Sequence, residues 1–386
     1  MINCAHYTSE RRQVSLDTIH LPLSLKQEHT GDGMVASPLV QNGICIIETA
    51  QRRLVCLDNQ TFTPLWETKS QEWASVPVAD ENRLYIKNFS TSQLVTIDLH
   101  TGERVKTEDN IGNIDQFIVD GRIYYLCYLA NDNCDKVICK NCNSHETIWE
   151  YVIDNEFYPD TFSGNASYIC IKNEQGSVIT LDVLTGKLRW LANPISIGIF
   201  KNQHEIDQLA NDDADFTLKN LKYTSGYATI YDNIFVTPNL NNYLVGLDLI
   251  NGHTLWKVRS KITHNFTRQA YSNEIYAMGN GYIESWDMLT GEQTRCIKID
   301  VGEYEDKVTP FAWRFTVSET HIYATIPNFF YAVNKESGKV DWMYEPDKQV
   351  TESDQPYIAN GRIYFRTLSG MYVFEGRDGY IPPSPQ

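Results

Sequence analysis

The stretch LDVLTGKLRW at residues 181–190 returns as LDLINGHTLW at residues 247–256. In each copy an apolar run ends in Asp, a Thr-Gly or Asn-Gly turn begins three residues later, and Trp stands eight residues after the Asp. The Asp or Asn of this pattern recurs along the chain, at Asp58, Asp98, Asn141, Asp182, Asp248, Asp287 and Asn334. The Trp recurs in most of these units, at Trp66, Trp149, Trp190, Trp256 and Trp342. A repeat of about 40 residues built from short strands is typical of solenoids and propellers.

Each unit is expected to contain four short strands joined by tight turns. The pairs Asn42-Gly43, Asp120-Gly121 and Asn360-Gly361 favour two-residue hairpin turns, because Asn, Asp and Gly tolerate positive φ. We expect the repeated Asp to accept backbone N–H groups two or three residues on, and the Gly of the turn to be left-handed. The Trp, on the fourth strand, is expected to pack between neighbouring units. Four strands per unit make one propeller blade.

Eight such units can be counted in the chain. They begin near Ser37, Ser75, Asn113, Thr161, Tyr227, Gln269, Ala312 and Asp354. The last stops after its third strand, at Phe374, and residues 18–26 alternate apolar and polar side chains, so this N-terminal segment is expected to supply the missing strand. Pro22 would be tolerated there because the outermost strand of a blade is an edge. We therefore predict an all-β, eight-bladed β-propeller in one domain of residues 1–386, with a long inter-blade insert at 191–226 and a tail at 377–386.

The two copies at Leu181–Trp190 and Leu247–Trp256 resemble the repeats of the pyrroloquinoline-quinone-type propellers. The resemblance covers roughly residues 37 to 375 and implies the fold. That superfamily includes quinoprotein dehydrogenases and non-enzymatic relatives such as a periplasmic lipoprotein of the outer-membrane assembly machine. The enzymes are longer and typically carry adjacent cysteines and a calcium site, and this chain has no adjacent cysteines. The resemblance therefore implies a scaffold without a quinone cofactor.

Net charge and cysteine content bear on which ligands the protein binds and on the compartment in which it is found. The net charge of −16 argues against nucleic acid as a direct ligand, since phosphates are neutralised by clustered Lys and Arg. The nine cysteines are scattered, and Cys56 and Cys139 occupy the same inward, small-residue position as Thr96, Thr180, Ser285 and Ala332. They are expected to be reduced core residues of a cytoplasmic protein. No signal peptide, lipid-anchor cysteine or membrane span is recognised, and we expect no membrane partner and a monomer when the protein is alone.

Acidic residues gather in the connections that lead from one unit to the next. The candidate partner-binding residues are Glu205, Asp207, Asp212, Asp213, Asp215, Asp154, Glu156, Glu303, Glu305 and Asp306. One interpretation is a solvated surface that keeps the protein soluble. The other is an acidic loop face that attracts a basic protein partner.

Two connections depart further from the repeat. The insert at 191–226 is long for a structureless loop, which favours either a binding segment or a strap packed on the blades. The connection after the fifth blade is basic, with Lys257, Arg259, Lys261, His264 and Arg268. These basic residues would pair with the neighbouring acidic insert or contact an acidic patch on a partner.

The sequence contains two partial motifs for metal or cofactor binding, and neither has the context that its function requires. Cys134, Cys139, Cys142 and His145 resemble a zinc set in spacing, but Cys139 and Cys142 should point to opposite faces of one strand, so we predict no metal. Gly31–Ala36 matches a dinucleotide fingerprint in letters only, because no strand precedes it. We predict no enzyme and no cofactor, and instead a protein-binding module, for example an inhibitor or immunity protein that neutralises a toxin. The alternative is an enzyme or a small-ligand binder, for quinone or sugar, that acts in the central channel.

Overall fold

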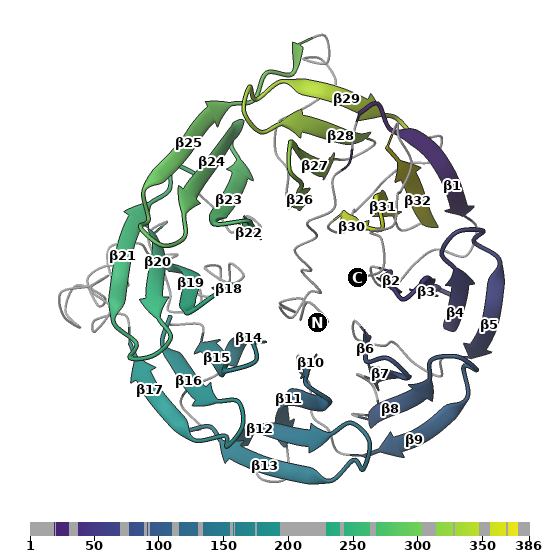
Figure 1. The fold of residues 1–386 in the computed structure, drawn as a ribbon, viewed down its shortest axis with the longest axis vertical. Coiled ribbons are helices and arrows are strands. Elements are labelled where there is room, and N and C mark those ends of the chain that lie inside the picture. Colours follow the sequence, from purple (N-terminus) through teal and green to yellow (C-terminus); the bar gives the residue numbers. More distant parts are fainter. Residues whose placement is uncertain are drawn as a thin grey trace, which may run out of the picture. The chain divides into compact units, whose positions relative to one another are not determined.

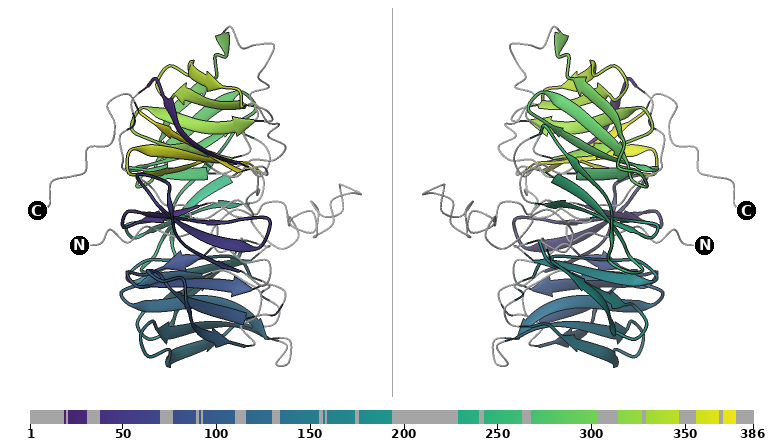
Figure 2. Two further views of the ribbon diagram at one scale, coloured as in Figure 1. Left: turned by 90° about the vertical axis from the view of Figure 1, so that its right-hand side faces the viewer. Right: turned by 90° about the vertical axis from the view of Figure 1, so that its left-hand side faces the viewer.

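The computed structural model is an all-β, eight-bladed β-propeller, as predicted. It describes residues 19, 21–30, 38–69, 77–88, 91, 93–109, 116–129, 134–154, 157, 159–173, 176–193, 229–239, 243–262, 268–302, 314–326, 329–346, 356–367 and 370–376. The regular elements in this part of the chain are strands, arranged in eight four-stranded sheets (Figures 1 and 2). None of the described elements is a helix long and apolar enough to cross a membrane.

The chain divides into two compact units, which are treated separately. The described residues within Gly112–Ala277 and Glu284–Thr294 form unit 1. Those within Gln13–Ile111, Met278–Ile283 and Arg295–Gln386 form unit 2. The prediction of a single domain stays a prediction.

Unit 1 contains blades 3, 4 and 5 and part of blade 6. Blade 3 consists of β10 (Gln116–Val119), β11 (Arg122–Leu129), β12 (Cys134–Asn141) and β13 (Thr147–Val152), and blade 4 of β14 (Pro159–Gly164), β15 (Tyr168–Asn173), β16 (Val178–Asp182) and β17 (Leu188–Ala192). Blade 5 consists of β18 (Thr229–Tyr231), β19 (Ile234–Asn239), β20 (Tyr243–Asp248) and β21 (Thr254–Arg259). Blade 6 consists of β22 (Arg268–Tyr271), β23 (Glu274–Gly279), β24 (Tyr282–Asp287) and β25 (Gln293–Lys298). The first strands of successive blades contact one another, so the fourth strands lie on the outer side (Figure 1).

Unit 2 contains blades 1, 2, 7 and 8 and the rest of blade 6. Blade 1 consists of β2 (Leu39–Gln41), β3 (Ile44–Glu48), β4 (Arg53–Asp58) and β5 (Pro64–Lys69), and blade 2 of β6 (Val78–Ala79), β7 (Arg83–Asn88), β8 (Gln93–Asp98) and β9 (Arg104–Glu108). Blade 7 consists of β26 (Phe315–Val317), β27 (His321–Ile326), β28 (Phe329–Asn334) and β29 (Val340–Tyr344). Blade 8 consists of β30 (Tyr357–Ala359), β31 (Arg362–Thr367), β32 (Gly370–Glu375) and β1 (Ser24–Thr30). The eighth blade thus uses both ends of the chain.

The closing strand pairs as predicted but begins later. β1 runs antiparallel to β32, with Ser24 opposite Glu375, and occupies residues 24–30 rather than 18–26. Leu21 and Pro22 form a bend, and Pro22 has no backbone N–H for a ladder. Ile19 and Leu23, ahead of the strand, are buried in the core between blades 7 and 8. The apolar side chains of this segment therefore belong to the core even where the backbone is not a strand.

The repeated Asp closes the turn between the third and fourth strands. Asp182 Oδ1 accepts the backbone N–H of Thr185 at 2.9 Å and its hydroxyl at 2.7 Å. In Asn141 an amide oxygen replaces the carboxylate and accepts the N–H groups of Asn143 and Ser144. The Gly that follows is left-handed, with φ +67° at Gly186. These turns confirm the local chemistry predicted from the repeat.

The small residue on the third strand faces the Trp of the fourth. Cys56 lies opposite Trp66, Cys139 opposite Trp149, Thr180 opposite Trp190, Gly246 opposite Trp256 and Ala332 opposite Trp342. The two strands slip by one residue directly after each of these pairs. An indole ring lying across the opposite position leaves room only for a small side chain, which explains why two cysteines occur there.

Lowering the pH is expected to remove the stabilisation supplied by the turn carboxylates. The backbone N–H of Thr61 lowers the pKa of Asp58, that of Thr101 lowers the pKa of Asp98, and the hydroxyl of Thr185 lowers the pKa of Asp182. A depressed folded-state pKa contributes stability above the unfolded value of about 3.9, and this contribution is lost as the pH falls through the folded-state pKa. Urea unfolding of wild type and of Asp58→Asn/Asp98→Asn/Asp182→Asn, from pH 6 to pH 2, checks this. The Asn variant should lose less stability below about pH 4, and parallel curves would contradict the expectation.

Candidate functional site

The described part of the connection between blades 3 and 4 contains one predicted site residue, Asp154. Ile153 and Phe157 on either side of it are buried in the core between these two blades. The backbone N–H of Phe157 donates to the carbonyl of Asp154 at 2.9 Å, and that of Ile153 donates to the carbonyl of Asp135 at 2.8 Å. The side chain of Asp154 is exposed. Apolar anchors therefore hold the backbone of this connection while the carboxylate stays in solvent.

The other predicted partner-binding residues lie outside the described residues: Glu205, Asp207, Asp212, Asp213, Asp215, Glu156, Glu303, Glu305 and Asp306. Most of the insert at 191–226 also lies outside them. Their positions relative to Asp154 are therefore not described. Whether they form one acidic face stays a prediction.

The remaining acids of the connections that are described have mixed surroundings. Glu150 is exposed and lies 4.0 Å from Lys136 Nζ. Asp300 accepts the N–H of Gly302 at 2.9 Å through Oδ1, and its backbone pairs with blade 7 next to Lys339. Glu345 is exposed. Only some of these carboxylates are therefore available to a partner, because Asp300 is used to hold its own turn.

A buried carboxylate, Glu284, holds the connection between blades 5 and 6. Glu284 lies on β24 and is fully buried. Its Oε2 accepts the hydroxyl of Ser260 at 2.6 Å and the backbone N–H of Lys261 at 3.1 Å, and its Oε1 accepts Gln293 Nε2 at 3.1 Å. A buried carboxylate must be compensated by such donors. The repeat pattern did not point to this residue; the only signal is an acid within the apolar run Ile283 to Trp286.

The basic connection beyond blade 5 is exposed where the structure describes it. Lys257, Arg259 and Lys261 are exposed, and Lys257 Nζ lies 5.2 Å from the ring centroid of Tyr243. The side chains of His264 and Arg268 lie outside the described residues. Pairing of this basic stretch with the acidic insert stays a prediction, whereas Glu284 fixes its backbone at Lys261.

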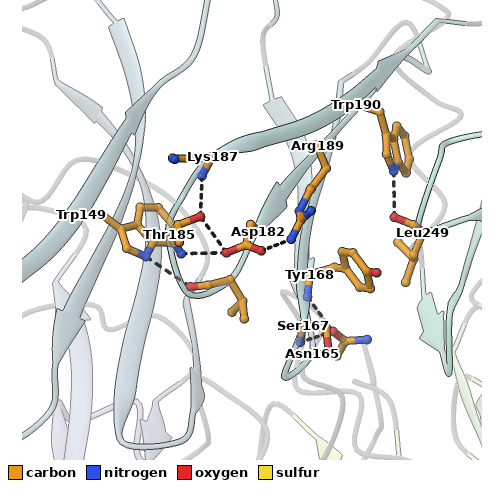
Figure 3. Close-up of polar contacts among 11 residues, drawn as sticks. Trp149, Asn165, Ser167, Tyr168, Asp182, Thr185, Lys187, Arg189, Trp190 and Leu249 are labelled. Carbon is orange, nitrogen blue, oxygen red and sulfur yellow. Dashed lines mark hydrogen bonds and ion pairs between the residues drawn. The ribbon is translucent and has the colours of Figure 1, made fainter.

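At the opposite ends of the strands, the turns of blades 4 and 5 are tied to the preceding blade by Trp (Figure 3). Trp149 Nε1 donates to the carbonyl of Val183 at 3.2 Å, and Trp190 Nε1 donates to that of Leu249 at 2.8 Å. Arg189 pairs with the carboxylate of Asp182, which also closes its own turn. Blade 3 is thereby locked to blade 4, and blade 4 to blade 5, through a backbone carbonyl, which confirms the predicted role of the Trp between these blades.

The cysteines of the suspected zinc set have structural surroundings. Cys139 lies in the core between blades 3 and 4, and burial raises the pKa of its thiol to about 11. Cys142 is also buried, and His145 takes the glycine position of the turn with φ +60°. The side chain of Cys134 lies outside the described residues. Across the described residues, no group of three or more His, Cys, Asp or Glu is placed to hold a metal ion.

Other buried thiols share this environment. Burial raises the pKa of Cys56 to about 12 and that of Cys170 to about 12. A thiol must ionise to act as a nucleophile, so burial in apolar surroundings makes these side chains inert. No disulfide joins the seven cysteines whose side chains the structure describes: Cys45, Cys56, Cys127, Cys139, Cys142, Cys170 and Cys296.

Comparison with solved structures gives the same architecture at low sequence identity. The crystal structure of BamB from Moraxella catarrhalis is 15% identical, with a TM-score of 0.64 over 92% of this chain and 100% of that chain. The computationally designed Ika8 protein is 10% identical, with a TM-score of 0.64 over 93% and 100%. Quinohemoprotein alcohol dehydrogenase from Comamonas testosteroni is 11% identical, with a TM-score of 0.63 over 94% of this chain and 78% of that chain. At these identities the likeness shows the fold alone.

Comparison at the level of sequence families is more specific. No curated protein matches the chain. The family model described as outer membrane protein assembly factor BamB matches residues 15–258 and 241–381, which together span most of the chain. The repeat of Asp, turn and Trp, the eight four-stranded blades and this match agree, and the chain therefore belongs to the BamB family of pyrroloquinoline-quinone-like β-propellers.

Proposed function

We propose that this chain is a non-catalytic, protein-binding propeller that engages a basic partner through the acidic connections between its blades. The observation that carries the proposal is the connection at Ile153 to Phe157, where buried anchors hold a backbone that leaves Asp154 exposed. A loop held in this way on a rigid scaffold loses little conformational entropy when it binds. The family match to an assembly factor supports a scaffold role.

The state of the described reactive side chains supports a role without catalysis. The thiols of Cys56, Cys139 and Cys170 are buried and their pKa values are raised, which is the opposite of activation. The conspicuous buried carboxylate, Glu284, is occupied by Ser260 and the backbone of Lys261. These groups stabilise the fold, which leaves the exposed connections to make contacts with a partner.

Within this proposal the chain acts in the cytoplasm, as an inhibitor or immunity protein that neutralises a basic toxin. Support comes from the net charge of −16, which favours fast association with a basic protein. Among the described cysteines six are buried and none is in a disulfide, which is typical of proteins of reducing compartments.

Retention of a partner from the native host at low and moderate salt tests the proposal. The immobilised protein should retain one stoichiometric basic protein that is released as the salt concentration rises, as identified by mass spectrometry. Neutralising Glu205, Asp207, Asp212, Asp213 and Asp215 to Gln or Asn should reduce this retention at least tenfold, which corresponds to about 1.4 kcal/mol.

The matched control neutralises five exposed glutamates in turns between strands of the same blade, Glu81, Glu103, Glu146, Glu292 and Glu319, and should retain the partner. If both variants lost retention of the partner equally, the binding would depend on net charge alone, and the acidic loop site would be wrong. An empty column, together with a melting shift on adding a quinone or sugar library, would favour the small-ligand alternative, because a ligand that binds the folded state raises its stability.

A further inference from the structure

The outer strand of blade 4, β17, carries two exposed leucines on the face that it turns toward blade 3. Leu191 lies opposite Ile179 of β16, and Leu188 lies opposite Leu181. Ile179 and Leu181 are buried in the core between blades 3 and 4, and side chains directly opposite one another on paired strands share a face of the sheet. The one-residue slip after Thr180 lets the two leucines share this face although they are three residues apart. Leu188 and Leu191, which are 49% and 60% exposed, therefore continue the apolar face outward beyond the core.

The outer strand of blade 3, β13, brings two aromatic side chains to the same core (Figure 1). Trp149 and Tyr151 pack against this core and are only partly buried. Trp149 is held in place, since its Nε1 donates to the carbonyl of Val183 at 3.2 Å and its ring lies against Gly186. Two partly buried rings and two exposed leucines thus lie at the outer end of one shared core. We name these four residues the blade 3–4 rim: Trp149, Tyr151, Leu188 and Leu191.

Other blades carry charge where blade 4 carries these leucines. At one of the two equivalent positions of the fourth strand, blades 1, 2, 3 and 5 have Glu67, Arg104, Glu150 and Lys257. Charged side chains on an exposed outer strand oppose association with another chain. Blade 7 has Val340 and Met343 at these positions, but Val340 is buried. The exposed leucines of blade 4 are therefore a departure from the repeat, and exposed apolar side chains that lie together often mark an interaction site.

The end of the blade 3–4 rim that lies toward the connection is acidic. Tyr151 is three residues before Asp154 in the chain. Burial, and to a smaller extent the negative charge of Asp154, raise the pKa of the Tyr151 hydroxyl, so the exposed carboxylate lies near this ring. At the turn end of β17, Arg189 pairs with Asp182 and Lys187 is exposed. A positively charged group bound beside the rim is therefore attracted to its connection end.

We propose that the blade 3–4 rim binds an apolar anchor residue of the basic partner, beside a Lys or Arg of that partner that faces Asp154. The anchor packs between the rings of β13 and the leucines of β17, where burial of apolar surface supplies affinity. The basic residue supplies charge complementarity at the connection end. The inference rests on the proposed function for the basic character of the partner and adds the place of its apolar contact. A second copy of this chain, or an anionic membrane, would be repelled by the net charge of −16.

A random peptide library displayed on phage and selected on the full-length protein tests the blade 3–4 rim. We expect the selected peptides to be enriched in Lys or Arg together with Leu, Phe or Trp. Synthetic versions should bind Leu188→Ser/Leu191→Ser about tenfold more weakly than wild type. Asp154→Asn should weaken binding at low salt and have little effect at high salt, because salt screens exposed charges.

The matched control is Val152→Ser/Leu184→Ser, which removes two aliphatic side chains of the same two blades. Val152 and Leu184 are 58% and 59% exposed, but Val152 follows Tyr151 on β13 and so faces the other side of the sheet, and Leu184 lies in the turn before β17. This variant should bind the peptides as wild type does. Circular dichroism of both double variants verifies that they are folded.

Four outcomes would overturn the blade 3–4 rim as a site for a basic partner. The selected peptides could lack basic residues, or they could bind the rim variant and the control equally well. Wild type, but not the rim variant, could sediment with phosphatidylglycerol vesicles, which would place a membrane there. Sedimentation velocity could show a dimer that the rim variant loses, which would make the occupant a second copy.

Retention of the partner from the native host separates this inference from the proposed function. If the rim variant retained a basic protein as strongly as wild type does, the blade 3–4 rim would be wrong and the proposed function would stand. If wild type retained no basic protein while peptides still bound in a rim-dependent way, the proposed function would be wrong and the rim would remain a peptide-binding site.

Discussion

Replacement of Trp256 by alanine is expected to lower the free energy of unfolding by about 3–5 kcal/mol. Trp256 is buried between blades 5 and 6, and its Nε1 donates to the carbonyl of Met288 at 2.8 Å. Its ring lies so close to two glycines that an added Cβ would be 2.3 Å away at Gly246 and 2.7 Å away at Gly291. Because both neighbours are glycines, no side chain can move into the space, so the alanine variant keeps a cavity and an unpaired carbonyl.

Urea-induced unfolding followed by circular dichroism measures this loss without relying on the fluorescence of the removed Trp. Leu255→Ala is the matched control, since Leu255 is the neighbouring residue on the same strand but is exposed; its effect should be within about 0.5 kcal/mol. Trp256→Phe keeps a ring and loses the donor, and its midpoint should lie between those of wild type and the alanine variant. Equal midpoints for Trp256→Ala and Leu255→Ala would show that this contact between blades does not stabilise the fold.

Replacement of Gly186 by alanine is expected to destabilise the protein for two separable reasons. Gly186 has φ +67°, a conformation that costs an L-residue about 1–2 kcal/mol. The new Cβ would also lie 2.4 Å from Cε3 of Trp149, and overpacking of this kind costs about 1–3 kcal/mol. Gly43→Ala separates the two terms, because Gly43 has φ +79° and its added Cβ would meet nothing within 4 Å.

We therefore expect Gly186→Ala to be more destabilising than Gly43→Ala by about 1–3 kcal/mol in urea unfolding. The double variant Trp149→Ala/Gly186→Ala should be more stable than the sum of the two single losses predicts, because removing the ring relieves the clash. Equal losses at Gly186 and Gly43, or strict additivity with Trp149→Ala, would mean that the turn glycine is required for its backbone conformation alone.

Much of the fold is readable from the sequence because the interactions that define a blade are local. Asp182 reaches Thr185 three residues away, and Gly186 follows at once, so their spacing alone indicates the turn. The repeat also marks Cys56 and Cys139 as small-residue positions, but the reason for their size, the Trp opposite on the next strand, follows only from the pairing of the strands. The later start of the closing strand could not be predicted, since its ladder partners lie in β32 at the other end of the chain.

The candidate sites depended far more on tertiary structure. Glu284 could not be assigned from sequence because Ser260 and Lys261, its partners, belong to the preceding blade. The exposure of Leu184, Ile250 and Leu289 could not be predicted either, because apolar residues in these repeats are buried at most other positions. Asp154 is the acidic site residue proposed from sequence that the structure describes. It is a candidate because its neighbours Ile153 and Phe157 are buried and hold the backbone beside it, which the charge of the sequence does not indicate.

By itself, the sequence determined the repeat, the number of blades and the chemistry of each turn, because these follow from propensities and hydrogen bonds that span a few residues. Only the tertiary structure decided which side chains are buried and which face solvent, because burial depends on strands that are distant in sequence. That difference separates Leu249, buried beneath Trp190, from its neighbour Ile250, which is exposed on the surface of the blade.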